Sequence, residues 1–392
     1  MRLFEKNNVG VIIIEGHVQG LSNTRALGEA GIPVIVVDKN NCLARYSKYC
    51  QKFFYCPDFI SDEFAPFLVD LAQKKNLSGW VLMPSNDHAV YSISKNKQEL
   101  EQYYKIIAPN IETLDKIYDK SKLLNLAKEV NVSIPETQYF TSINETIDAK
   151  LTFPLITKGR FGLTFYKSLG RKAFLSDSER ELREHLKKIQ DKYHVEKTFT
   201  QELIPFDGTN KTISFTAFSV NGVIKTFWIG EKVREHPIQF GTATFARSIH
   251  KPELVEPSQR LLKALNYTGV CEIEYLLDPR NGLYKLIEIN ARTWLWVGLA
   301  KRCGVNYAVY IYNYLNNIST QYPASYTLGV NWVNYVTDTS YSLIAIVKRK
   351  LSLKKYFTAF KGKRVDAFFS WRDIKPSLMF FVLLFYFAIK RR

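Results

Sequence analysis

The chain has 392 residues, of which 46% are hydrophobic and 23% are charged. This mixture is typical of globular proteins, and it excludes disorder, collagen and coiled coil as the main architecture. At about 150 residues per domain the length predicts two or three domains, and 54 Lys and Arg against 37 Asp and Glu give a formal charge of +17.

The cysteine pattern indicates ordinary buried thiols in a reducing environment. No two cysteines form a Cys-x-x-Cys pair and no histidine cluster accompanies them, so a zinc site is the weaker interpretation. Residues 1–8 lead directly into a predicted strand and lack the apolar core of a signal peptide. We therefore expect a cytoplasmic protein with free thiols at Cys42, Cys50, Cys56, Cys271 and Cys303.

The N-terminal segment is predicted to begin with a β-α-β unit. Residues 9–14 form an apolar strand, a turn leads into a helix that ends near residue 30, and residues 34–37 form a second strand. The absence of a Gly-x-Gly-x-x-Gly motif argues against dinucleotide binding. Continued by a helix over 62–75 and a strand over 80–83, this order predicts an open parallel sheet.

The loop after that strand, Pro84-Ser85-Asn86-Asp87, is polar. Polar side chains just past the carboxyl end of a strand lie where open α/β sheets bind ligands. Ser85 or Asp87 could equally cap the next helix, and the sequence leaves both interpretations open.

Beyond residue 137 the pattern changes to longer strands with hairpin spacing. Two helices, over 111–115 and 119–130, connect the two parts. Few helices interrupt the strands that follow, which predicts an α+β region built on antiparallel sheets. The predicted strands are 153–157, 165–168, 198–203, 212–220, 223–230, 270–277 and 283–289, and the predicted helices are 177–190 and 256–265.

The segment 269–292 is the most informative part of the sequence. Its Asp-Pro-Arg-Asn-Gly run, 278–282, predicts a turn between two apolar strands and therefore a hairpin. If the strands pair directly from that turn, Glu274 lies about level with Glu288 on the next strand. Glu288 and Asn290 are two residues apart, so their side chains project from the same face.

Two carboxylates and an amide oxygen would then converge on one spot. Like charges so close are costly unless a cation lies between them, and such oxygen ligands suit Mg²⁺, with Mn²⁺ as an alternative. The common alternative to a metal site is that these acidic residues simply lie on the solvent-exposed face of a sheet. Because Glu288 and Asn290 lie in an otherwise apolar strand that leads into Arg292, we favour a metal site formed with Glu274.

Two upstream lysines are suited to phosphate binding. Lys158 follows the predicted strand 153–157 and opens a loop with Gly159 and Gly162, where a backbone can approach a ligand closely. Lys120 lies at the start of a helix, a position that favours anions. Each lysine alone is weak evidence, because most lysines are simply solvated.

The order of these segments resembles the ATP-grasp superfamily, and most closely its carboxylate–amine ligases related to D-aspartate ligase and the ATP domain of carbamoyl-phosphate synthetase. The similarity covers residues 9–318, and its final motif is the most specific part. The segments are Asp119-Lys120, Phe-Pro-Leu-Ile-Thr before Lys158, Gln201-Glu202-Leu203-Ile204-Pro205, Glu274, and Glu288-Ile289-Asn290-Ala291-Arg292.

The resemblance implies an α/β plus α+β protein. Residues 1–115 would form the N-terminal domain with the open parallel sheet. A two-lobed ATP-grasp domain with antiparallel sheets would follow, with a small lobe over 116–200 and a large lobe over 201–330. A basic C-terminal extension would span 331–392 and contain an apolar helix over 377–389.

The resemblance also implies roles for individual residues. Lys120 and Lys158 would hold the α- and β-phosphates of ATP, and the backbone of 201–204 would meet the adenine. Arg292, together with Lys158, would act in catalysis by neutralising the transferred phosphoryl group. The other implied positions are Glu274, Glu288 and Asn290 for Mg²⁺, Gln201, Glu202, Leu203, Ile204 and Asp207 for the nucleotide, and Arg234, Gly241, Thr242 and Asp87 for the substrate side.

Two features depart from the family pattern. Asn210 and Lys211 stand where many relatives carry an acidic residue for the ribose hydroxyls, so ribose binding would depend on Asp207 or Glu202. The segment 159–170, which we expect to be a loop that closes over the phosphates, is poor in glycine.

The implied function is an ATP-dependent ligase. Transfer of the γ-phosphoryl group would activate a small-molecule carboxylate as an acyl phosphate, which an amine attacks, and an amino acid would be one substrate. No Ser-His-Asp or Cys-His arrangement indicates a protein nucleophile. The alternative is a non-catalytic nucleotide-binding protein with a degenerate ATP-grasp site.

The C-terminal segment carries most of the excess charge. Residues 341–392 contain thirteen Lys or Arg and two Asp, which is +11 of the formal +17. The uncharged apolar run 377–389 is shorter than the about 20 residues that span a bilayer. We expect either a helix packed against the ligase domain or peripheral attachment to an anionic membrane, at the inner face of the cytoplasmic membrane. The lysines accompany no recognisable nucleic-acid module, so no nucleic-acid binding is expected.

Overall fold

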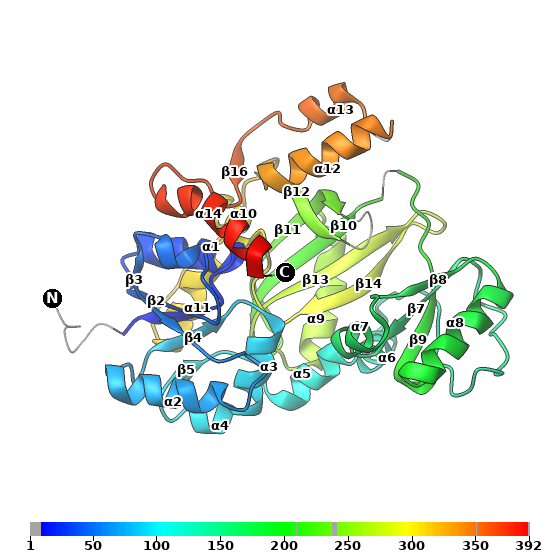
Figure 1. Ribbon diagram of the computed structural model, residues 1–392, viewed down its shortest axis with the longest axis horizontal. Helices are drawn as coiled ribbons and strands as arrows, with labels where there is room; N and C mark the ends of the chain where they lie inside the picture. Colours follow the sequence, from blue (N-terminus) through cyan, green and yellow to red (C-terminus); the bar gives the residue numbers. More distant parts are fainter. Residues whose placement is uncertain (1–8, 209, 237–240, 350, 391–392) are drawn as a thin grey trace.

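The computed structural model describes residues 9–208, 210–236, 241–349 and 351–390. The segment 1–8 and the basic residues Lys350, Arg391 and Arg392, which the sequence analysis used, lie outside the described residues. Three sheets organise the chain, with the N-terminal domain and the small lobe on either side of the large lobe (Figure 1).

The N-terminal domain is an open parallel sheet, as predicted, with strand order β3-β2-β1-β4-β5. Val11 and Ile13 pack into one core cluster and Ile12 and Ile14 into another, because both faces of the sheet are covered. The strands are β1 (Val11–Ile14), β2 (Val34–Asp38), β3 (Cys50–Tyr55), β4 (Val81–Pro84) and β5 (Lys105–Ile106), and the helices are α1 (Val18–Glu29), α2 (Phe64–Lys75), α3 (Asp87–Lys95) and α4 (Lys97–Leu100).

The small lobe is an antiparallel sheet with strand order β6-β9-β7-β8. Helix α5 (Ile111–Tyr118) crosses the domain boundary predicted at residue 115, and α6 (Lys120–Glu129) leads into the lobe. The remaining elements are β6 (Thr137–Gln138), β7 (Leu155–Gly159), α7 (Gly162–Leu169), β8 (Phe174–Ser176), α8 (Glu179–Lys192) and β9 (Thr198–Glu202).

The predicted strand over 165–168 is wrong, because these residues belong to helix α7. Phe165 is fully buried against the rings of Phe174 and Tyr193, a contact that the helix makes from one face. Gly159 allows this packing, since a Cβ there would lie 2.3 Å from Phe165. The expected phosphate-covering loop over 159–170 is therefore largely a helix held by the buried Phe165, and it ends at Gly170 with a φ of +70°.

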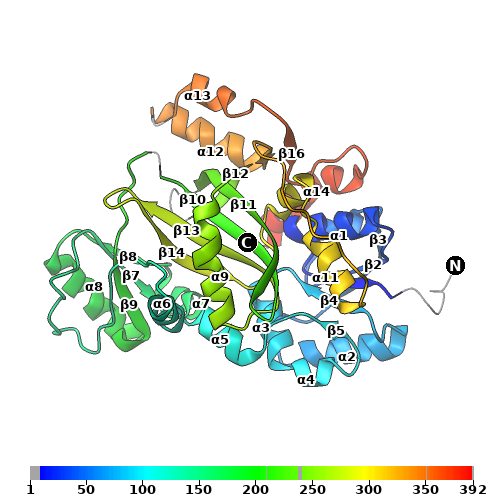
Figure 2. The ribbon, with the colours of Figure 1, turned by 180° about the vertical axis from the view of Figure 1, so that it is seen from behind.

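The large lobe is a seven-stranded sheet with strand order β14-β13-β10-β11-β12-β15-β16. Its pairs are antiparallel except β15 with β16, and α9 lies on one face (Figure 2). The elements are β10 (Thr212–Val220), β11 (Val223–His236), β12 (Thr242–Ser248), α9 (Val255–Ala264), β13 (Gly269–Asp278), β14 (Leu283–Asn290), α10 (Val297–Arg302), α11 (Tyr307–Leu315), β15 (Asn331–Val333) and β16 (Arg364–Asp366).

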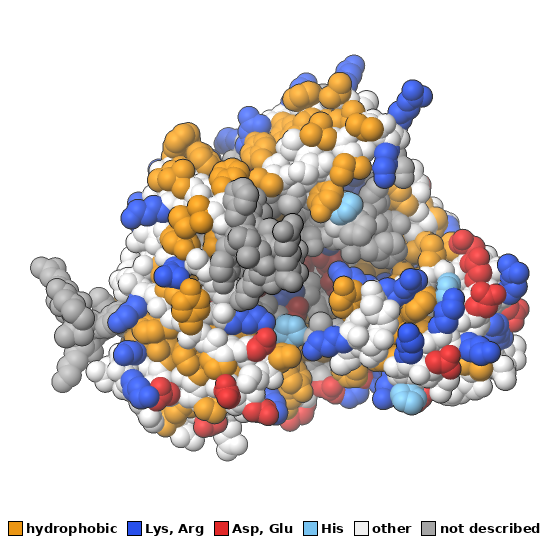
Figure 3. Space-filling model, in the orientation of Figure 1, with side chains coloured by type: hydrophobic (Ala, Val, Ile, Leu, Met, Phe, Trp, Pro, Cys, Tyr) orange, Lys and Arg blue, Asp and Glu red, His pale blue; other side chains and the backbone are white. Residues whose placement is uncertain are grey.

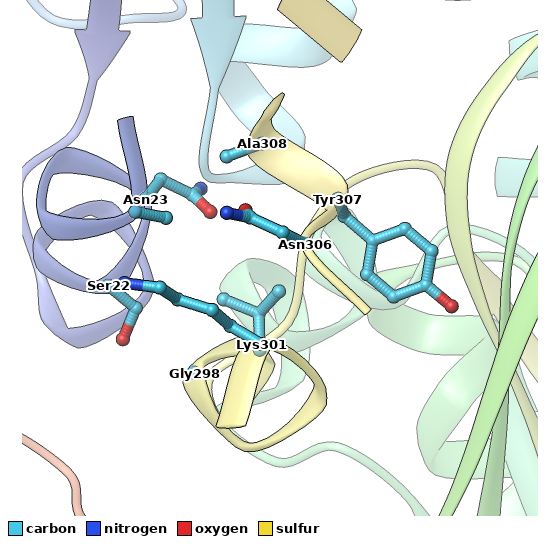
Figure 4. Close-up of a pocket in the computed structure, with 9 residues that line it drawn as sticks. Ser22, Asn23, Gly298, Lys301, Asn306, Tyr307 and Ala308 are labelled. Carbon is cyan, nitrogen blue, oxygen red and sulfur yellow. The ribbon is translucent and has the colours of Figure 1, made fainter. Parts of the chain in front are cut away.

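The N-terminal domain packs against the large lobe through α1, α10 and α11. One hydrophobic cluster contains residues from both parts, and the Asn23 amide donates to the Thr293 hydroxyl at 2.9 Å. Asn23 and Asn306 face one another beside a cavity of only about 10 Å³ (Figure 4). A space this small holds no more than about one water, so the joint is packed rather than a ligand site.

The C-terminal extension is integrated into the fold. Strands β15 and β16 extend the large-lobe sheet past the boundary predicted at residue 330, with α12 (Tyr335–Val347) and α13 (Leu353–Thr358) between them. Asp373 accepts hydrogen bonds from Arg25, Ser47 and the Lys48 amide, so the segment before α14 (Lys375–Lys390) is tied to the N-terminal domain. Among the described helices, none combines the length and apolar character needed to cross a membrane.

Arg234, predicted on the substrate side, connects the extension to the large lobe. Its guanidinium donates to both carboxylate oxygens of Asp338 on α12, each at 2.7 Å. The same group lies over the ring of Phe245 at 4.4 Å, with Tyr356 and Phe360 from the extension also in range. Asp338 is 1% exposed, so this is a buried ion pair in an aromatic setting.

Replacing Asp338 by Asn should destabilise the chain, because it leaves the Arg234 charge buried without its partner. We expect the free energy of unfolding to fall by about 3 kcal/mol, measured by urea unfolding. Asp62→Asn is the matched control, since the Asp62 side chain is fully exposed. Equal stability of the two variants would contradict the assignment.

Candidate functional site

The β13–β14 hairpin brings the predicted acids to one face. Glu274 lies directly opposite Glu288, and Glu272 lies opposite Asn290, which confirms the predicted level. The register shifts by one residue beside Glu274, so Ile287 is an extra residue in β14. Without this bulge Glu288 would pair with Ile273 and project from the opposite face to Glu274.

Glu272 belongs to the same cluster, although the sequence analysis did not select it. Its carboxylate accepts hydrogen bonds from the Ser214 hydroxyl at 2.6 Å and from the Asn290 amide at 3.0 Å. The Asn290 amide also lies 3.5 Å from a Glu288 oxygen. The spacing of Glu272 and Glu274 along β13, two residues apart, was the signal that could have identified it.

Each of the two opposed glutamates pairs with a lysine from another element. Lys120 Nζ lies 3.0 Å from Glu288, and Lys232 Nζ of β11 lies 2.8 Å from Glu274. Attraction to Lys120 holds the pKa of Glu288 below its ordinary value. Burial by itself would lower the pKa of Lys232, but the charge of Glu274 raises it above the ordinary range. The sequence analysis missed Lys232, which no spacing rule connects to the hairpin.

Lys120 and Lys158 share this site. Lys120 begins α6, where a cation is unfavourable beside the helix dipole, and Glu288 offsets that cost. Burial and the neighbouring charge of Lys120 lower the pKa of Lys158 to about 8, while Glu288 opposes the change. The tertiary structure thus gathers both predicted phosphate-binding lysines beside the acidic hairpin.

The donor atoms fit a divalent cation that takes part of its coordination from a ligand. Among the described residues, no three His, Cys, Asp or Glu side chains form a ready metal cluster. Two carboxylates, Glu274 and Glu288, and the Asn290 amide oxygen are what one hairpin face supplies. This incomplete oxygen set suits Mg²⁺, which commonly binds one or two carboxylates plus substrate phosphates.

Arg292 is held by the N-terminal domain. Its Nε and Nη2 atoms each donate to Asp87 at 2.8 Å, and Tyr118 also donates to Asp87. Burial opposes the charged form of Arg292, but Asp87 more than compensates, and the pKa of the guanidinium is raised. The helix cap is neither Ser85 nor Asp87, because the Asn86 side chain accepts the Ala89 amide.

The nucleotide-side candidates lie on β9 and the loop after it, where their side chains have internal partners. Gln201 donates to the Thr137 hydroxyl at 2.8 Å. The Glu202 carboxylate accepts from Arg280 at 2.7 Å, which joins the lobes. The backbone amide of Leu203 donates to the Pro154 carbonyl, and Ile204 begins the connection to the large lobe. The backbone amides of Asp207 and Asn210 each donate to the side chain of the other residue.

The other substrate-side candidates do not all gather at the hairpin. Thr242 begins β12 opposite His236, and Gly241 directly precedes it, beside the segment 237–240 that is outside the described residues. Arg234 pairs with Asp338 in the C-terminal extension. Of the four substrate-side candidates, Asp87 directly contacts Arg292.

A cavity of about 290 Å³ lies at the carboxyl ends of β1 and β2. Glu15 and Asp38 contribute carboxylates to its wall, while Phe380 and Leu383 of α14 contribute apolar surface. Burial, followed by the charge of Asp38, raises the pKa of Glu15 to about 8, and Arg292 opposes this change. Figure 3 shows the face on which the N-terminal domain and the small lobe border a central hollow.

Glu15 also has an unusual backbone conformation, with a φ of +71° at the end of β1. A non-glycine residue in this region is strained, and such residues concentrate at functional sites. Gly20 permits the turn, since a Cβ there would lie 2.1 Å from the Glu15 carbonyl oxygen. The sequence analysis did not select Glu15, because its conformation and its neighbours follow only from the fold.

Comparison with known proteins agrees with this geometry. The family model described as carbamoyl-phosphate synthase L chain, ATP binding domain, matches residues 230–304, which include the acidic hairpin and Arg292. D-aspartate ligase of Enterococcus faecium is 24% identical over 225 residues, covering 54% of this chain and 53% of that protein. N5-carboxyaminoimidazole ribonucleotide synthase of Staphylococcus epidermidis is 26% identical, covering 69% of this chain and 67% of that protein.

A solved structure of biotin carboxylase from Campylobacter jejuni superposes with a TM-score of 0.65 at 16% identity, covering 82% of this chain and 74% of that chain. A likeness at this identity shows the fold alone. The chain spans 53% of the D-aspartate ligase that it matches. The chain thus has the fold of biotin carboxylase and is similar to D-aspartate ligase, and its acidic hairpin lies in a segment similar to the ATP-binding domain of carbamoyl-phosphate synthase.

Proposed function

We propose that the chain is an ATP-dependent ligase that activates a small-molecule carboxylate as an acyl phosphate and joins it to an amine. The observation that carries the proposal is the convergence of two lysines and an acidic hairpin on one spot, with a half-buried arginine beside them. The similarity to a D-aspartate ligase supports an amino acid as one substrate. The residues concerned are Lys120, Lys158, Glu274, Glu288, Asn290 and Arg292.

Glu274, Glu288 and the Asn290 amide oxygen would hold Mg²⁺, and Mn²⁺ would suit the same oxygen atoms. The bound cation would supply charge compensation for the phosphate oxygens of ATP. In the described structure Lys120 and Lys232 compensate the two carboxylates instead. Binding of the cation would leave Lys120 available for a phosphate.

The chain's own residues would contribute placement and electrostatic stabilisation. Lys158, with a pKa of about 8, is predominantly charged at neutral pH, and a nearby phosphate would favour that charge further. Arg292 carries a permanent charge that Asp87 keeps in one orientation, so it would stabilise the negative charge of the transferred phosphoryl group. No protein nucleophile is required for this reaction.

The cavity beside Glu15 suits the amine substrate. A substrate ammonium group would be stabilised by the carboxylates of Glu15 and Asp38, and it would favour the ionised form of Glu15. Arg292 interacts electrostatically with Glu15, so the cavity and the phosphate-binding residues are neighbours. The backbone of 201–204 and Asp207 are proposed to serve the nucleotide, with Gly241 and Thr242 on the substrate side.

The alternative function, non-catalytic nucleotide binding, has one specific observation in its favour. The segment 159–170, where we expected a closing loop, forms helix α7, and the Phe165 side chain of this helix is fully buried.

The proposed cytoplasmic location is supported by the five cysteines, all of which are free thiols. We also propose that the chain attaches peripherally to the inner face of the cytoplasmic membrane.

Glu288→Gln should abolish amine-dependent release of ADP, because it removes one of the two opposed carboxylates. We expect a loss of roughly two orders of magnitude or more in a screen of amino acids with ATP and Mg²⁺. Glu184→Gln on the exposed side of α8 is the matched control and should retain activity. Full activity of the Glu288→Gln variant would contradict the proposed site.

Arg292→Lys keeps a positive charge but loses the two-point contact with Asp87. We expect kcat to fall roughly 10-fold to 100-fold while the Kd for ATP changes little, since the guanidinium acts on the transferred group. Steady-state kinetics and nucleotide titration measure the two quantities. If the wild-type chain binds ATP but releases no ADP in response to any amine, the results would favour the alternative function, non-catalytic nucleotide binding.

Glu15→Gln should change how stability depends on pH. The pKa of Glu15 is raised in the folded chain from 4.5 to about 8, so between these values the unfolded chain binds fewer protons at this position. The free energy of unfolding therefore falls as pH rises through this window, and the effect is absent at lower pH. Thermal unfolding at about pH 5 and about pH 8 should show a smaller loss in Glu15→Gln than in wild type. An identical loss in both proteins would refute the raised pKa.

A further inference from the structure

Helix α12 turns two polar residues inward and several large apolar residues outward. Asp338 and Ser342, one helical turn apart, are both buried, and Asp338 pairs with Arg234 of the large lobe. Leu343, Ile344 and Val347 are exposed, and Val347 is 83% exposed. A surface helix of a soluble domain normally shows the reverse arrangement, so this helix presents an apolar face to its surroundings.

Helix α13 continues the same apolar surface. Leu353 and Phe357, four residues apart on one face, are exposed, Phe357 by 65%. The Thr339 and Tyr356 hydroxyls lie 3.1 Å apart, which connects α12 to α13. We call the exposed apolar residues Leu343, Ile344, Val347, Leu353 and Phe357 the α12–α13 surface.

Basic side chains surround this surface. Exposed lysines and arginines lie just after α12, on α13, and in the segment from the end of α13 to the start of β16. Figure 3 shows blue side chains around the orange ones over α12 and α13. The acids of this region are occupied: Asp338 by Arg234, and Asp366 by the Phe368 and Phe369 amides. The exposed basic residues are Lys348, Arg349, Lys354, Lys355, Lys361, Lys363 and Arg364.

An apolar centre with a basic rim is complementary to an anionic lipid surface. Apolar side chains enter the boundary between headgroups and acyl chains, while lysine and arginine remain at the phosphate level. A second copy of this chain would bring two basic rims together, and the like charges would repel. The charge pattern therefore favours a lipid bilayer over self-association.

From the sequence, the apolar run 377–389 could be either a helix packed against the protein or a membrane anchor, and the contacts of its described part favour packing. Phe380 of α14 stacks on Phe368 with ring centroids 4.0 Å apart, and Leu383 is 3% exposed. Asp373, just before α14, is held by Arg25. The inner face of the described part of α14 thus packs on the protein, whereas the exposed part of α12 joins that of α13 in one apolar surface with basic residues beside it.

We propose that the α12–α13 surface is a membrane-docking site that inserts shallowly into the interface of a bilayer rich in anionic lipids. The buried Arg234–Asp338 pair, beneath α12, holds the surface rigidly to the large lobe. Docking here would place the ligase domain at the membrane without a spanning segment. The proposal does not depend on the ligase activity.

Vesicle flotation with the full chain tests the proposal. Vesicles of phosphatidylcholine with phosphatidylglycerol should retain the chain, and vesicles of phosphatidylcholine alone should retain roughly tenfold less, with binding weakened by salt. The double variant Val347→Ser with Phe357→Ser should bind the phosphatidylglycerol vesicles about fivefold less than wild type. Its unfolding temperature and ATP turnover should equal those of wild type. Lys354→Gln with Lys355→Gln should weaken binding and reduce its dependence on salt.

The matched control is Leu378→Ser with Phe381→Ser, which changes exposed residues of α14 and should retain vesicle binding. Failure of the wild type to bind phosphatidylglycerol vesicles would overturn the proposal. So would a loss of binding in the α14 variant equal to or greater than that in the α12–α13 variant. A dimer in light scattering that Val347→Ser with Phe357→Ser dissociates, without vesicle binding by wild type, would instead assign the surface to self-association.

Discussion

The opposition of Glu274 and Glu288 across the β13–β14 hairpin is the constraint on which the proposed site depends. Two carboxylates on adjacent strands repel, so the fold must supply positive charge from elsewhere. It does so with Lys120 from the start of α6 and Lys232 from β11. The geometry that makes the hairpin costly in isolation is what makes it suitable for a cation and a polyphosphate.

Ion pairs also connect the parts of the molecule around this hairpin. Arg292 pairs with Asp87 of the N-terminal domain, and Arg280 beside the hairpin turn pairs with Glu202 of the small lobe. Each pair has one partner that is largely shielded from solvent and one that is more exposed, and its charge-assisted hydrogen bonds oppose displacement of one part against another. The large lobe is thus the centre to which the N-terminal domain and the small lobe are attached by charge as well as by packing.

Much of the fold and of the candidate site could be predicted, because it depends on patterns between residues that are close in the sequence. The apolar strands of the parallel sheet, the turn at 278–282 and the i, i+2 spacing of Glu288 and Asn290 are all short-range features. The strand predicted over 165–168 was wrong because long-range packing, which no local pattern shows, decided the structure there. Its aromatic residues favour a strand locally, but burial of Phe165 against Phe174 and Tyr193 is achieved from a helix.

The sequence by itself determined the fold class, the order of the motifs and the acidic hairpin, because periodicity and turn chemistry act between near neighbours. Only the tertiary structure decided which charges meet: Lys120 reaches Glu288 across 168 positions, and Arg292 reaches Asp87 across 205. It likewise decided that Ile287 is an extra residue in β14, that Glu15 has a strained backbone, and that α12 turns Asp338 and Ser342 inward. Such pairings depend on how whole elements pack, and no spacing along the chain specifies them.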